Sequence, residues 1–252
     1  MIKPRTLGVL TKAERRKVGA SYIVTAMGLF DLARPDAERF ENSQSLWLLA
    51  AKALPKGSFL DIGMPKPQAE LLVAGFARAP DGKPTSAMSV EWLVGPLRKR
   101  LIVFGDRYWT IAGSGYAATE PRPFVEIALS PERAFGGPGH ADNPNGLGFR
   151  AGDRLLAREL AMLPNIESAD QLVHAIEDRP PPALCGPLDI ASPKRLRYAG
   201  VYDNHWLKQV APALPDDVDP RLFLFAPEDQ IFPTYLKGGE PYVLRGFSDD
   251  SA

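Results

Sequence analysis

The sequence predicts a mainly β fold: a β-meander or sandwich-like core with a few short helices and a proline-rich, irregular C-terminal half. Short apolar runs separated by glycine and proline fill the first half of the chain, which is typical of strands joined by tight turns. The chain has 25 prolines among 252 residues, about twice the average share in proteins. Because proline neither donates to a β-ladder nor fits inside a helix, this content argues against the long helices of a doubly wound α/β fold.

The first predicted strands lie far apart in the sequence. The run Tyr22–Leu32 is apolar with β-branched members, which favours a strand. Glu70–Arg78 is apolar on both faces, as expected of a central strand. Ala79–Gly82 then supplies proline, aspartate and glycine, and these residues predict a turn.

The next segment alternates cleanly between apolar and polar residues. We expect Met88, Val90, Trp92 and Val94 on one side of a strand, and Ser89 and Glu91 on the other. Gly95-Pro96 ends this strand, and Leu97–Phe104 forms the next one. We predict that Gly105–Arg107 is a tight turn and that Tyr108–Ala112 pairs with Leu97–Phe104, which completes a meander of four strands.

The second half of the chain contains two candidate helices. Arg154–Leu163 has leucines at helical spacing and ends before Pro164. Asn204–Val210 follows Asp203, which can cap it, and the predicted face of this helix consists of Trp206, Leu207 and Val210. Prolines recur at short intervals in the rest of this half, which prevents long helices and strands. We therefore expect this segment to wrap around a core formed by the first half of the chain.

The length and the absence of internal repeats favour a single domain over residues 1–252. Within it we expect an N-terminal segment at residues 1–20 and a core at residues 21–247. Residues 248–252 are expected to form a short disordered tail.

Charge and cysteine content limit the expected partners and the compartment. The 30 basic residues balance 30 acidic ones, so no net field attracts the chain to nucleic acid or to an anionic membrane. We therefore interpret the basic clusters Arg98–Arg100 and Lys194–Arg197 as solvated strand ends. The single cysteine, Cys185, suits a reducing compartment. With no long apolar run, the sequence predicts a soluble, cytoplasmic protein with neither a nucleic-acid nor a membrane partner.

Three glycine-rich stretches resemble phosphate-binding loops at first sight. Gly113–Ala118 fits the dinucleotide pattern G-x-G-x-x-A, but Pro121 and Pro123 forbid the helix that must follow it. Glu132–Gly137 and Asn143–Phe149 lack the lysine and hydroxyl residue of a P-loop. Their glycines more simply supply turn conformations, and we predict no cofactor.

No group of residues completes a catalytic or metal-binding pattern. His140 and Asp142 share the glycine-rich loop, but a zinc site needs three or four ligands. Cys185 lies in a proline-rich stretch, and lone cysteines are more often packing residues than nucleophiles. The aspartates of Asp216–Asp219 lack the glycine and the terminal glutamate of an EF-hand loop. We predict no metal and no catalytic residue.

Several segments nevertheless form an ordered set. They are Val94–Lys99, Val103–Arg107 with Trp109, Glu132–Gly137, Asn143–Phe149, Leu163–Glu167, Gly200–Asp203 with Trp206, Leu214–Asp217 with Asp219–Arg221, Ala226–Gln230 and Leu236–Glu240. In this order and spacing, which extends from about Tyr22 to Phe247, they resemble the domain of unknown function 2169 family.

The resemblance implies a binding protein rather than an enzyme. It implies a place in a bacterial type VI secretion cluster, where such proteins act as adaptors or chaperones that help to load effectors, often through a spike-tip protein with PAAR repeats. The family has no agreed catalytic residues, so none is transferred to this chain. We therefore expect a cytoplasmic adaptor that binds a secreted effector, a PAAR-repeat spike-tip protein, or both.

Two alternatives remain open on the residues alone. One is a hydrolase that uses His140 and Asp142 in the glycine-rich loop. The other is a carbohydrate-binding or small-ligand module built on the β meander.

Eight residues are candidates for partner binding or for pinning loops. Large side chains near proline-fixed loops can anchor a partner at a limited cost in entropy. The candidates are Asp106, Arg133, Phe135, Phe149, Asp203, Trp206, Phe232 and Tyr235. Asp106 and Arg133 can equally pair with each other and pin loops. Aromatic residues beside glycine often belong to the core.

Overall fold

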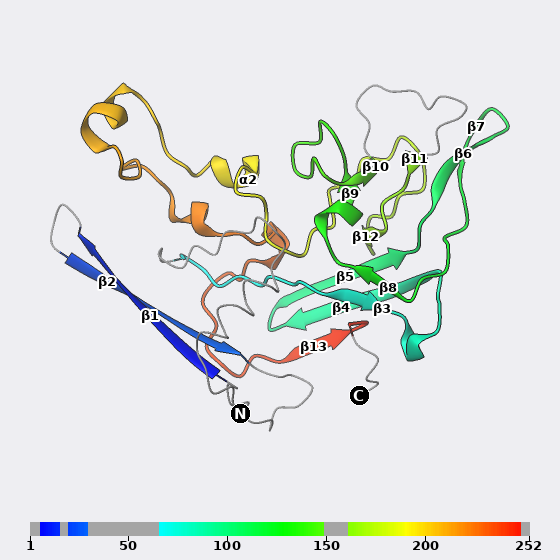
Figure 1. Cartoon of the computed structure of the whole chain (residues 1–252), viewed down its shortest axis with the longest axis horizontal. Helices are drawn as coiled ribbons and strands as arrows, with labels where there is room; N and C mark the ends of the chain where they lie inside the picture. Colours follow the sequence, from blue (N-terminus) through cyan, green and yellow to red (C-terminus); the bar gives the residue numbers. More distant parts are fainter. Residues whose placement is uncertain (1–5, 16–19, 30–65, 149–160, 248–252) are drawn as a thin grey trace. The chain divides into compact units, whose positions relative to one another are not determined.

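The computed structural model describes residues 6–15, 20–29, 66–148 and 161–247. The chain divides into two compact units, each assembled from separate stretches of sequence (Figure 1). Unit 1 comprises Met1–Pro67 and Tyr198–Leu224, and unit 2 comprises Gln68–Arg197 and Phe225–Ala252. That the two units belong to a single domain stays a prediction.

The largest sheet of unit 2 has four antiparallel strands in the order β12-β5-β4-β13 (Figure 1). These strands are β12 (Ile166–Ser168), β5 (Leu97–Phe104), β4 (Ala87–Val94) and β13 (Tyr242–Arg245). Between β4 and β5 the chain turns at Gly95, which has a φ of 53° that favours glycine. The structure therefore confirms the two predicted strands and the turn that joins them.

The hydrophobic core of unit 2 lies against one face of this sheet. Val90 and Trp92 of β4 are fully buried, as are Leu101 and Val103 of β5. Ile127 of β8 (Glu126–Ala128) belongs to the same cluster. Burying a side chain of this size contributes roughly 1.5–3 kcal/mol. The alternation predicted from the sequence thus places the core side chains on one face of the sheet.

A second sheet contains β6 (Tyr108–Ala112), and here the predicted meander is wrong. β6 pairs with β7 (Gly115–Ala118) and with β11 (Ala161–Met162), and it does not pair with β5. The reason is that β12 already occupies the edge of β5 that β6 would need. The Phe104 N–H donates to the carbonyl of Asn165 at 2.8 Å, which extends this pairing to the end of β5.

Two short pairings complete the strands of unit 2. β3 (Phe76–Arg78) pairs antiparallel with β8, and β9 (Phe135–Gly136) pairs parallel with β10 (Leu147–Gly148). The prediction of a central strand over Glu70–Arg78 is therefore wrong except for its last three residues. Upstream of them, backbone N–H groups bond instead to irregular segments, as at Leu71 with Gln230 and at Val73 with Cys185, both at 2.9 Å.

The helical elements are short, as predicted, and proline starts most of them. They are α2 (Pro193–Leu196), 3-10 turns at Pro80–Gly82, Pro131–Arg133, Pro220–Phe223 and Glu228–Gln230, and a π-helical turn at Trp206–Val210. Proline suits the first helical position because its missing N–H would have no partner there. Proline at this position explains how a proline-rich chain can still form helical turns.

One predicted helix is contradicted where it can be compared, and the other is present. Residues 154–160 lie outside the described residues, but Ala161–Met162 forms strand β11 rather than the end of a helix. The segment Asn204–Val210 is helical, although Leu207 is 61% exposed and so does not share a buried face.

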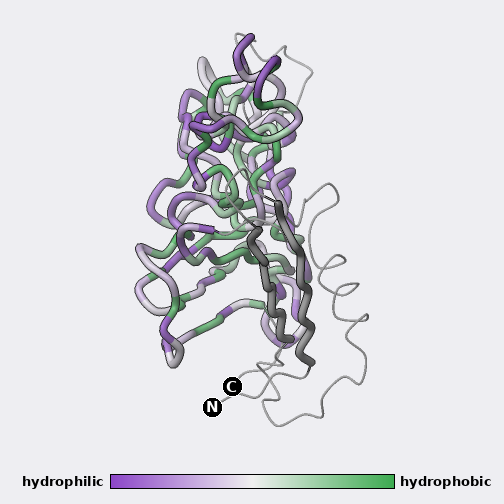
Figure 2. The backbone as a smooth tube through the Cα atoms, turned by 90° about the vertical axis from the view of Figure 1, so that its left-hand side faces the viewer, coloured by the Kyte–Doolittle hydropathy of each residue, from purple (hydrophilic) through white to green (hydrophobic). Residues whose placement is uncertain are grey.

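Hydrophobic and hydrophilic stretches alternate along the backbone (Figure 2). Within the described ranges, no helix combines the length and the apolar character needed to cross a membrane.

Unit 1 contains one long hairpin and an irregular segment. β1 (Thr6–Arg15) pairs antiparallel with β2 (Ala20–Leu29) over ten residues of each strand. The predicted strand Tyr22–Leu32 is confirmed as far as Leu29, and its last residues lie outside the described ranges. The expected N-terminal segment contains β1, which the sequence did not predict as a strand. The tail expected to be disordered, residues 248–252, also lies outside the described residues.

Candidate partner-binding site

Several segments of the ordered set lie in unit 2, where polar side chains join three of them. Arg133 Nη1 donates to Asp106 Oδ1 at 3.3 Å and to Asn165 Oδ1 at 3.0 Å. Asn165 is fully buried, and its Nδ2 donates to Asp106 Oδ1 and to the carbonyl of Phe104, both at 3.1 Å. Asp106 and Arg133 therefore pin three loops to one another.

A buried ion pair between Arg107 and Glu167 adjoins this network. Arg107 Nη2 donates to Glu167 Oε1 and to the carbonyl of Pro164, the latter at 3.3 Å. The second oxygen of Glu167 accepts the Val173 N–H at 2.8 Å. The Arg107 guanidinium also lies over the Phe104 ring, 3.8 Å from its centroid. Burial raises the pKa of the Glu167 carboxyl, and the Arg107 charge opposes that rise. Such a pair is costly to break, because removing one partner leaves a buried charge.

The glycine-rich loop is held by a buried amide rather than shaped around a ligand. Asn143 is 3% exposed, and its Nδ2 donates to the carbonyls of Pro131 and Phe135 at 2.7 and 3.1 Å. At Gly146 an added Cβ would lie 2.6 Å from the carbonyl oxygen of Ala134. The backbone approaches itself so closely there that only glycine fits. The glycines thus serve the packing of the loop.

His140 and Asp142 use their polar atoms inside the same loop. His140 Nδ1 accepts the N–H groups of Asp142 and Asn143, both at 3.2 Å, and its ring lies edge-on to Phe135. Burial lowers the pKa of His140, which favours the neutral ring that these bonds need. The Asp142 carboxylate pairs with Lys194 at 3.3 Å. Among the described residues, no group of three or more metal-ligating side chains comes together.

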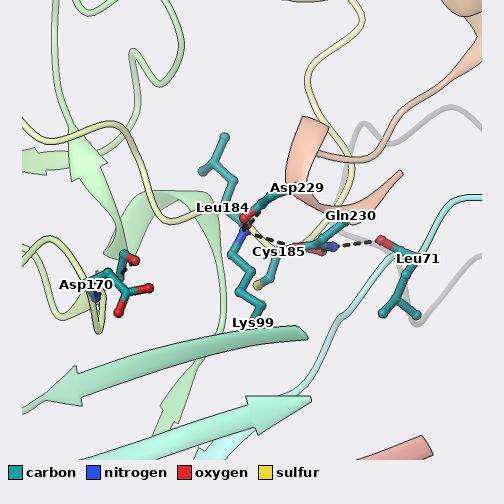
Figure 3. Close-up of polar contacts among 8 residues, drawn as sticks. Leu71, Lys99, Asp170, Leu184, Cys185, Asp229 and Gln230 are labelled. Atoms are coloured by element: carbon teal, nitrogen blue, oxygen red, sulfur yellow. Dashed lines mark hydrogen bonds and ion pairs between the residues drawn. The ribbon is translucent and has the colours of Figure 1, made fainter. Parts of the chain in front are cut away.

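Lys99 forms the second polar centre of unit 2. Its Nζ donates to the carbonyl of Leu184 at 2.5 Å, to Asp229 Oδ2 at 2.8 Å and to Gln230 Oε1 at 3.1 Å. Figure 3 shows the side chain reaching from β5 toward the turn that carries Asp229 and Gln230. An ammonium group has three protons, and three residues here accept them. Lys99 is therefore saturated by the protein, and its side chain is only 10% exposed.

Gln230 extends this centre into the core. Its Nε2 donates to the carbonyls of Leu71 and Cys185, at 2.7 and 2.8 Å, while its Oε1 accepts from Lys99 (Figure 3). Gln230 is fully buried, so these bonds compensate for the loss of water. The neighbouring thiol of Cys185 is also buried, which raises its pKa to about 11 and keeps it protonated near neutral pH.

A pocket of about 240 Å³ opens beside Lys99. Its apolar wall consists of Pro181, Pro182, Ala183, Leu184, Leu188 and Pro227. The charged groups that line it are already paired with protein groups: Asp229 with Lys99, Lys194 with Asp142, and Glu228 with Arg197. A rigid proline-lined pocket whose charges are satisfied suits an apolar side chain more than a charged ligand.

The other candidate residues of unit 2 lie in different environments. Phe135 and Phe232 are each 3% exposed and pack inside the protein. Tyr235 is 62% exposed and offers the largest accessible aromatic surface of the three. Phe149 lies outside the described residues.

The candidates in unit 1 stabilise a local turn. Asp203 Oδ1 accepts the Trp206 N–H at 2.8 Å, which caps the helical turn. Trp206 Nε1 donates to the carbonyl of Ala213 at 2.8 Å, and its ring lies edge-on to Tyr202, 4.7 Å between centroids. Tyr202 and Leu207 are more than half exposed, so apolar surface surrounds this turn.

Sequence reasoning missed the residues that organise the pocket. It interpreted Arg98–Arg100 as a solvated strand end, but Lys99 is directly opposite the fully buried Trp92 and points to the core side of the sheet. The sequence of β5 could have revealed this orientation, because Lys99 and the buried Leu101 are two residues apart and so point to the same face of the strand. The second basic cluster is also not simply solvated: Arg195 is 5% exposed and lies over the Phe225 ring. Gln230 carried no such signal, since its partners are distant carbonyls.

Comparison with known proteins assigns the chain to a family by its sequence. No curated protein and no solved structure matches the chain. A family model described as an uncharacterized protein conserved in bacteria (DUF2169) matches residues 19–252. This match includes every segment of the ordered set, among them those that meet at Asp106, Arg133 and Asn165. The chain is therefore a member of the DUF2169 family of uncharacterized bacterial proteins.

Proposed function

We propose that this chain is a non-enzymatic adaptor or chaperone. In the proposal it binds a type VI secretion effector, a PAAR-repeat spike-tip protein, or both, and assists their loading from the cytoplasm. Membership of an uncharacterised bacterial family is compatible with this role. The observation that carries the proposal is the pocket beside Lys99.

The pocket supports binding of a protein through an apolar anchor residue. With a volume of about 240 Å³ it can admit a side chain, and proline and leucine form much of its wall. The Lys99 bonds to Leu184 and Asp229 fix part of that wall and its rim before any partner arrives. A preformed pocket loses little entropy on binding, which favours a stable contact with one anchor side chain.

The glycine-rich loop gives less support to the hydrolase alternative. A general base must offer a free nitrogen to the reacting group. In this chain His140 Nδ1 already accepts two backbone N–H groups, and Asp142 pairs with Lys194 rather than orienting the histidine. The polar groups of the loop therefore favour a structural role, and the pocket is the stronger basis for a function.

Co-expression with the products of neighbouring genes tests the proposed function. We expect the neighbouring effector or PAAR-repeat protein to become soluble and to co-purify with the tagged chain as a discrete complex. An unrelated effector from a distant gene cluster serves as the control and should not co-purify. If no neighbouring product is solubilised or captured, the adaptor function is wrong.

A further inference from the structure

The largest sheet of unit 2 has a second face, opposite to its core. Side chains alternate along β4, so Glu91, which lies between the buried Val90 and Trp92, points to this second face. In the strand register, Glu91 is opposite Arg100 of β5 and Arg245 of β13. Arg98 lies two residues before Arg100 and so shares its face. We call Glu91, Arg98, Arg100 and Arg245 the basic face.

One carboxylate fixes two of the arginines of the basic face. Arg98 Nε donates to Glu91 Oε1 at 2.7 Å, and Arg245 Nη1 donates to Glu91 Oε2 at 2.9 Å. The Glu91 side chain is 10% exposed, whereas those of Arg98 and Arg245 are 63% and 70% exposed. The bond to Arg98 lowers the pKa of Glu91, so the carboxylate stays charged near neutral pH. Both guanidinium groups are thus held in place while most of their surface faces outward.

Arg100 adds a positive charge that no described residue neutralises through an ion pair. It is exposed and makes no ion pair with any residue in the described part of the chain. Asp170 lies in the turn beside it, where the Ala169 N–H donates to the Arg100 carbonyl, but no ion pair joins these two side chains in the described structure. The three arginines therefore outnumber the one carboxylate, although the whole chain has a formal net charge of zero.

The spacing of these charges suits an extended chain with carboxylates. Arg98 and Arg100 are two residues apart on one strand, which corresponds to about 6.8 Å along the strand direction. Carboxylates at alternate positions of an extended segment repeat at the same distance. A guanidinium group binds carboxylate through parallel N–H bonds. Val243 of β13, which is 37% exposed, lies two residues before Arg245 and adds apolar surface to the same face.

We propose that the basic face binds an extended acidic segment of a partner protein, with Asp or Glu at alternate positions facing Arg98 and Arg100. The inference rests on the proposed adaptor function and names the chemistry of the segment that such a partner presents. Glu91 is a positioning residue, because it orients Arg98 and Arg245 without contacting the partner. The pocket beside Lys99 lies on the other side of the sheet and would take a separate apolar anchor.

The test uses the full chain and a fluorescein-labelled peptide of alternating glutamate and threonine. A peptide of alternating lysine and threonine serves as the negative probe, and single-stranded DNA is tested in parallel. Of the three probes, we expect only the acidic peptide to bind measurably. Its affinity should fall as the salt concentration rises from about 50 to about 300 mM. Binding should be at least about tenfold weaker in Arg100→Glu, because a repulsive carboxylate replaces a donor.

Two variants separate recognition from folding. Arg100 makes no side-chain bond to any other described residue, so Arg100→Glu should keep the circular dichroism spectrum and the Tm of the native chain. Arg122→Glu makes the same substitution at an exposed residue outside the sheet and should bind the peptide as the native chain does. A weaker effect of Arg100→Gln than of Arg100→Glu would support direct charge recognition.

The experiment distinguishes failure of the basic-face inference from failure of the adaptor function. If the acidic peptide does not bind, or if Arg100→Glu binds as well as the native chain, the inference is overturned. DNA binding that depends on Arg100 and is tighter than peptide binding would also overturn it, in favour of a phosphate-binding face. A neighbouring effector that co-purifies equally with Arg100→Glu would keep the adaptor function and remove the basic face from it.

Discussion

At the scale of single residues, the polar side chains of the ordered segments mainly bond to the protein itself. Asn165 joins Asp106 and Arg133, Asn143 holds the glycine-rich loop, and Gln230 bridges Leu71 and Cys185. A buried polar group is costly unless it is hydrogen-bonded, so each of these residues specifies one arrangement of the loops around it. These segments therefore define the framework that holds the candidate binding surfaces.

The buried pair of Arg107 and Glu167 gives the first prediction. Glu167→Gln removes the charge partner of a buried guanidinium, so the free energy of unfolding should fall by about 3–5 kcal/mol. Glu126→Gln is the matched control, because Glu126 pairs with Arg78 at an exposed site where both side chains are more than 40% accessible. The control should cost less than about 1 kcal/mol. Equal losses in urea unfolding would show that the Arg107 pair is not a buried constraint.

His140 gives a prediction about pH. Burial keeps the pKa of His140 in the folded chain below its value in the unfolded chain. The unfolded chain therefore binds the extra proton more readily, so stability is full above about pH 7 and falls as the pH drops toward about 5. His140→Asn can keep an acceptor near the position of Nδ1 but does not titrate there. We expect a smaller loss of stability between these pH values in the variant.

Urea unfolding of both proteins at about pH 7.5 and about pH 5.5 measures this difference. The two proteins differ only at residue 140, so the difference between their losses of stability reports on this histidine. If the native chain and His140→Asn lose the same free energy, the bonds from Asp142 and Asn143 do not hold the neutral ring.

At the scale of elements, the alternation of side chains along β5 divides one basic cluster between the two faces of the sheet. Lys99 points to the core side and completes the polar centre beside the pocket, whereas Arg98 and Arg100 point to the opposite face. A run of three basic residues in a strand is therefore not one electrostatic patch. The strand therefore places a structural cation and the proposed recognition surface on opposite faces of the same sheet.

The turn after β5 gives a prediction about close packing. An alanine Cβ at Gly105 would lie 1.7 Å from the carbonyl oxygen of Arg122, so Gly105→Ala must move backbone. We expect it to lower the free energy of unfolding by at least about 2 kcal/mol. The control Gly115→Ala in β7 meets no atom within 4 Å and should change stability by less than about 1 kcal/mol. Similar Tm values for the two variants would contradict the tight approach at Gly105.

Local pattern predicted the β4–β5 hairpin, because its alternation, its turn and its short connection all lie within one segment. Pattern did not predict which strand occupies the other edge of β5. That edge is taken by β12, about sixty residues later in the sequence. The same limit explains the failure at Glu70–Arg78: the N–H groups of Leu71 and Val73 bond to carbonyls far along the chain, although their side chains pack against the core of the sheet.

At the scale of the whole molecule, the chain divides into two units and has a formal net charge of zero. Unit 2 nevertheless has a local excess of positive charge on the basic face, and the pocket lies on the other side of the same sheet. The sequence predicted the pairing of Asp106 with Arg133 as one possibility, and the structure contains that pair. It could not predict the pocket, because prolines from two separate stretches of chain, Pro181–Pro182 and Pro227, must come together to form its wall.

The most direct test of the adaptor function is the affinity of the purified chain for the effector or PAAR-repeat protein encoded beside it. Gln171 is exposed at the rim of the pocket, so Gln171→Trp should obstruct the pocket without disturbing the core. Glu177→Trp adds the same ring at an exposed residue that does not line the pocket. The account predicts that the partner binds the native chain and Glu177→Trp alike, and Gln171→Trp at least about tenfold more weakly. Equal binding by all three proteins, or binding by none, would contradict it.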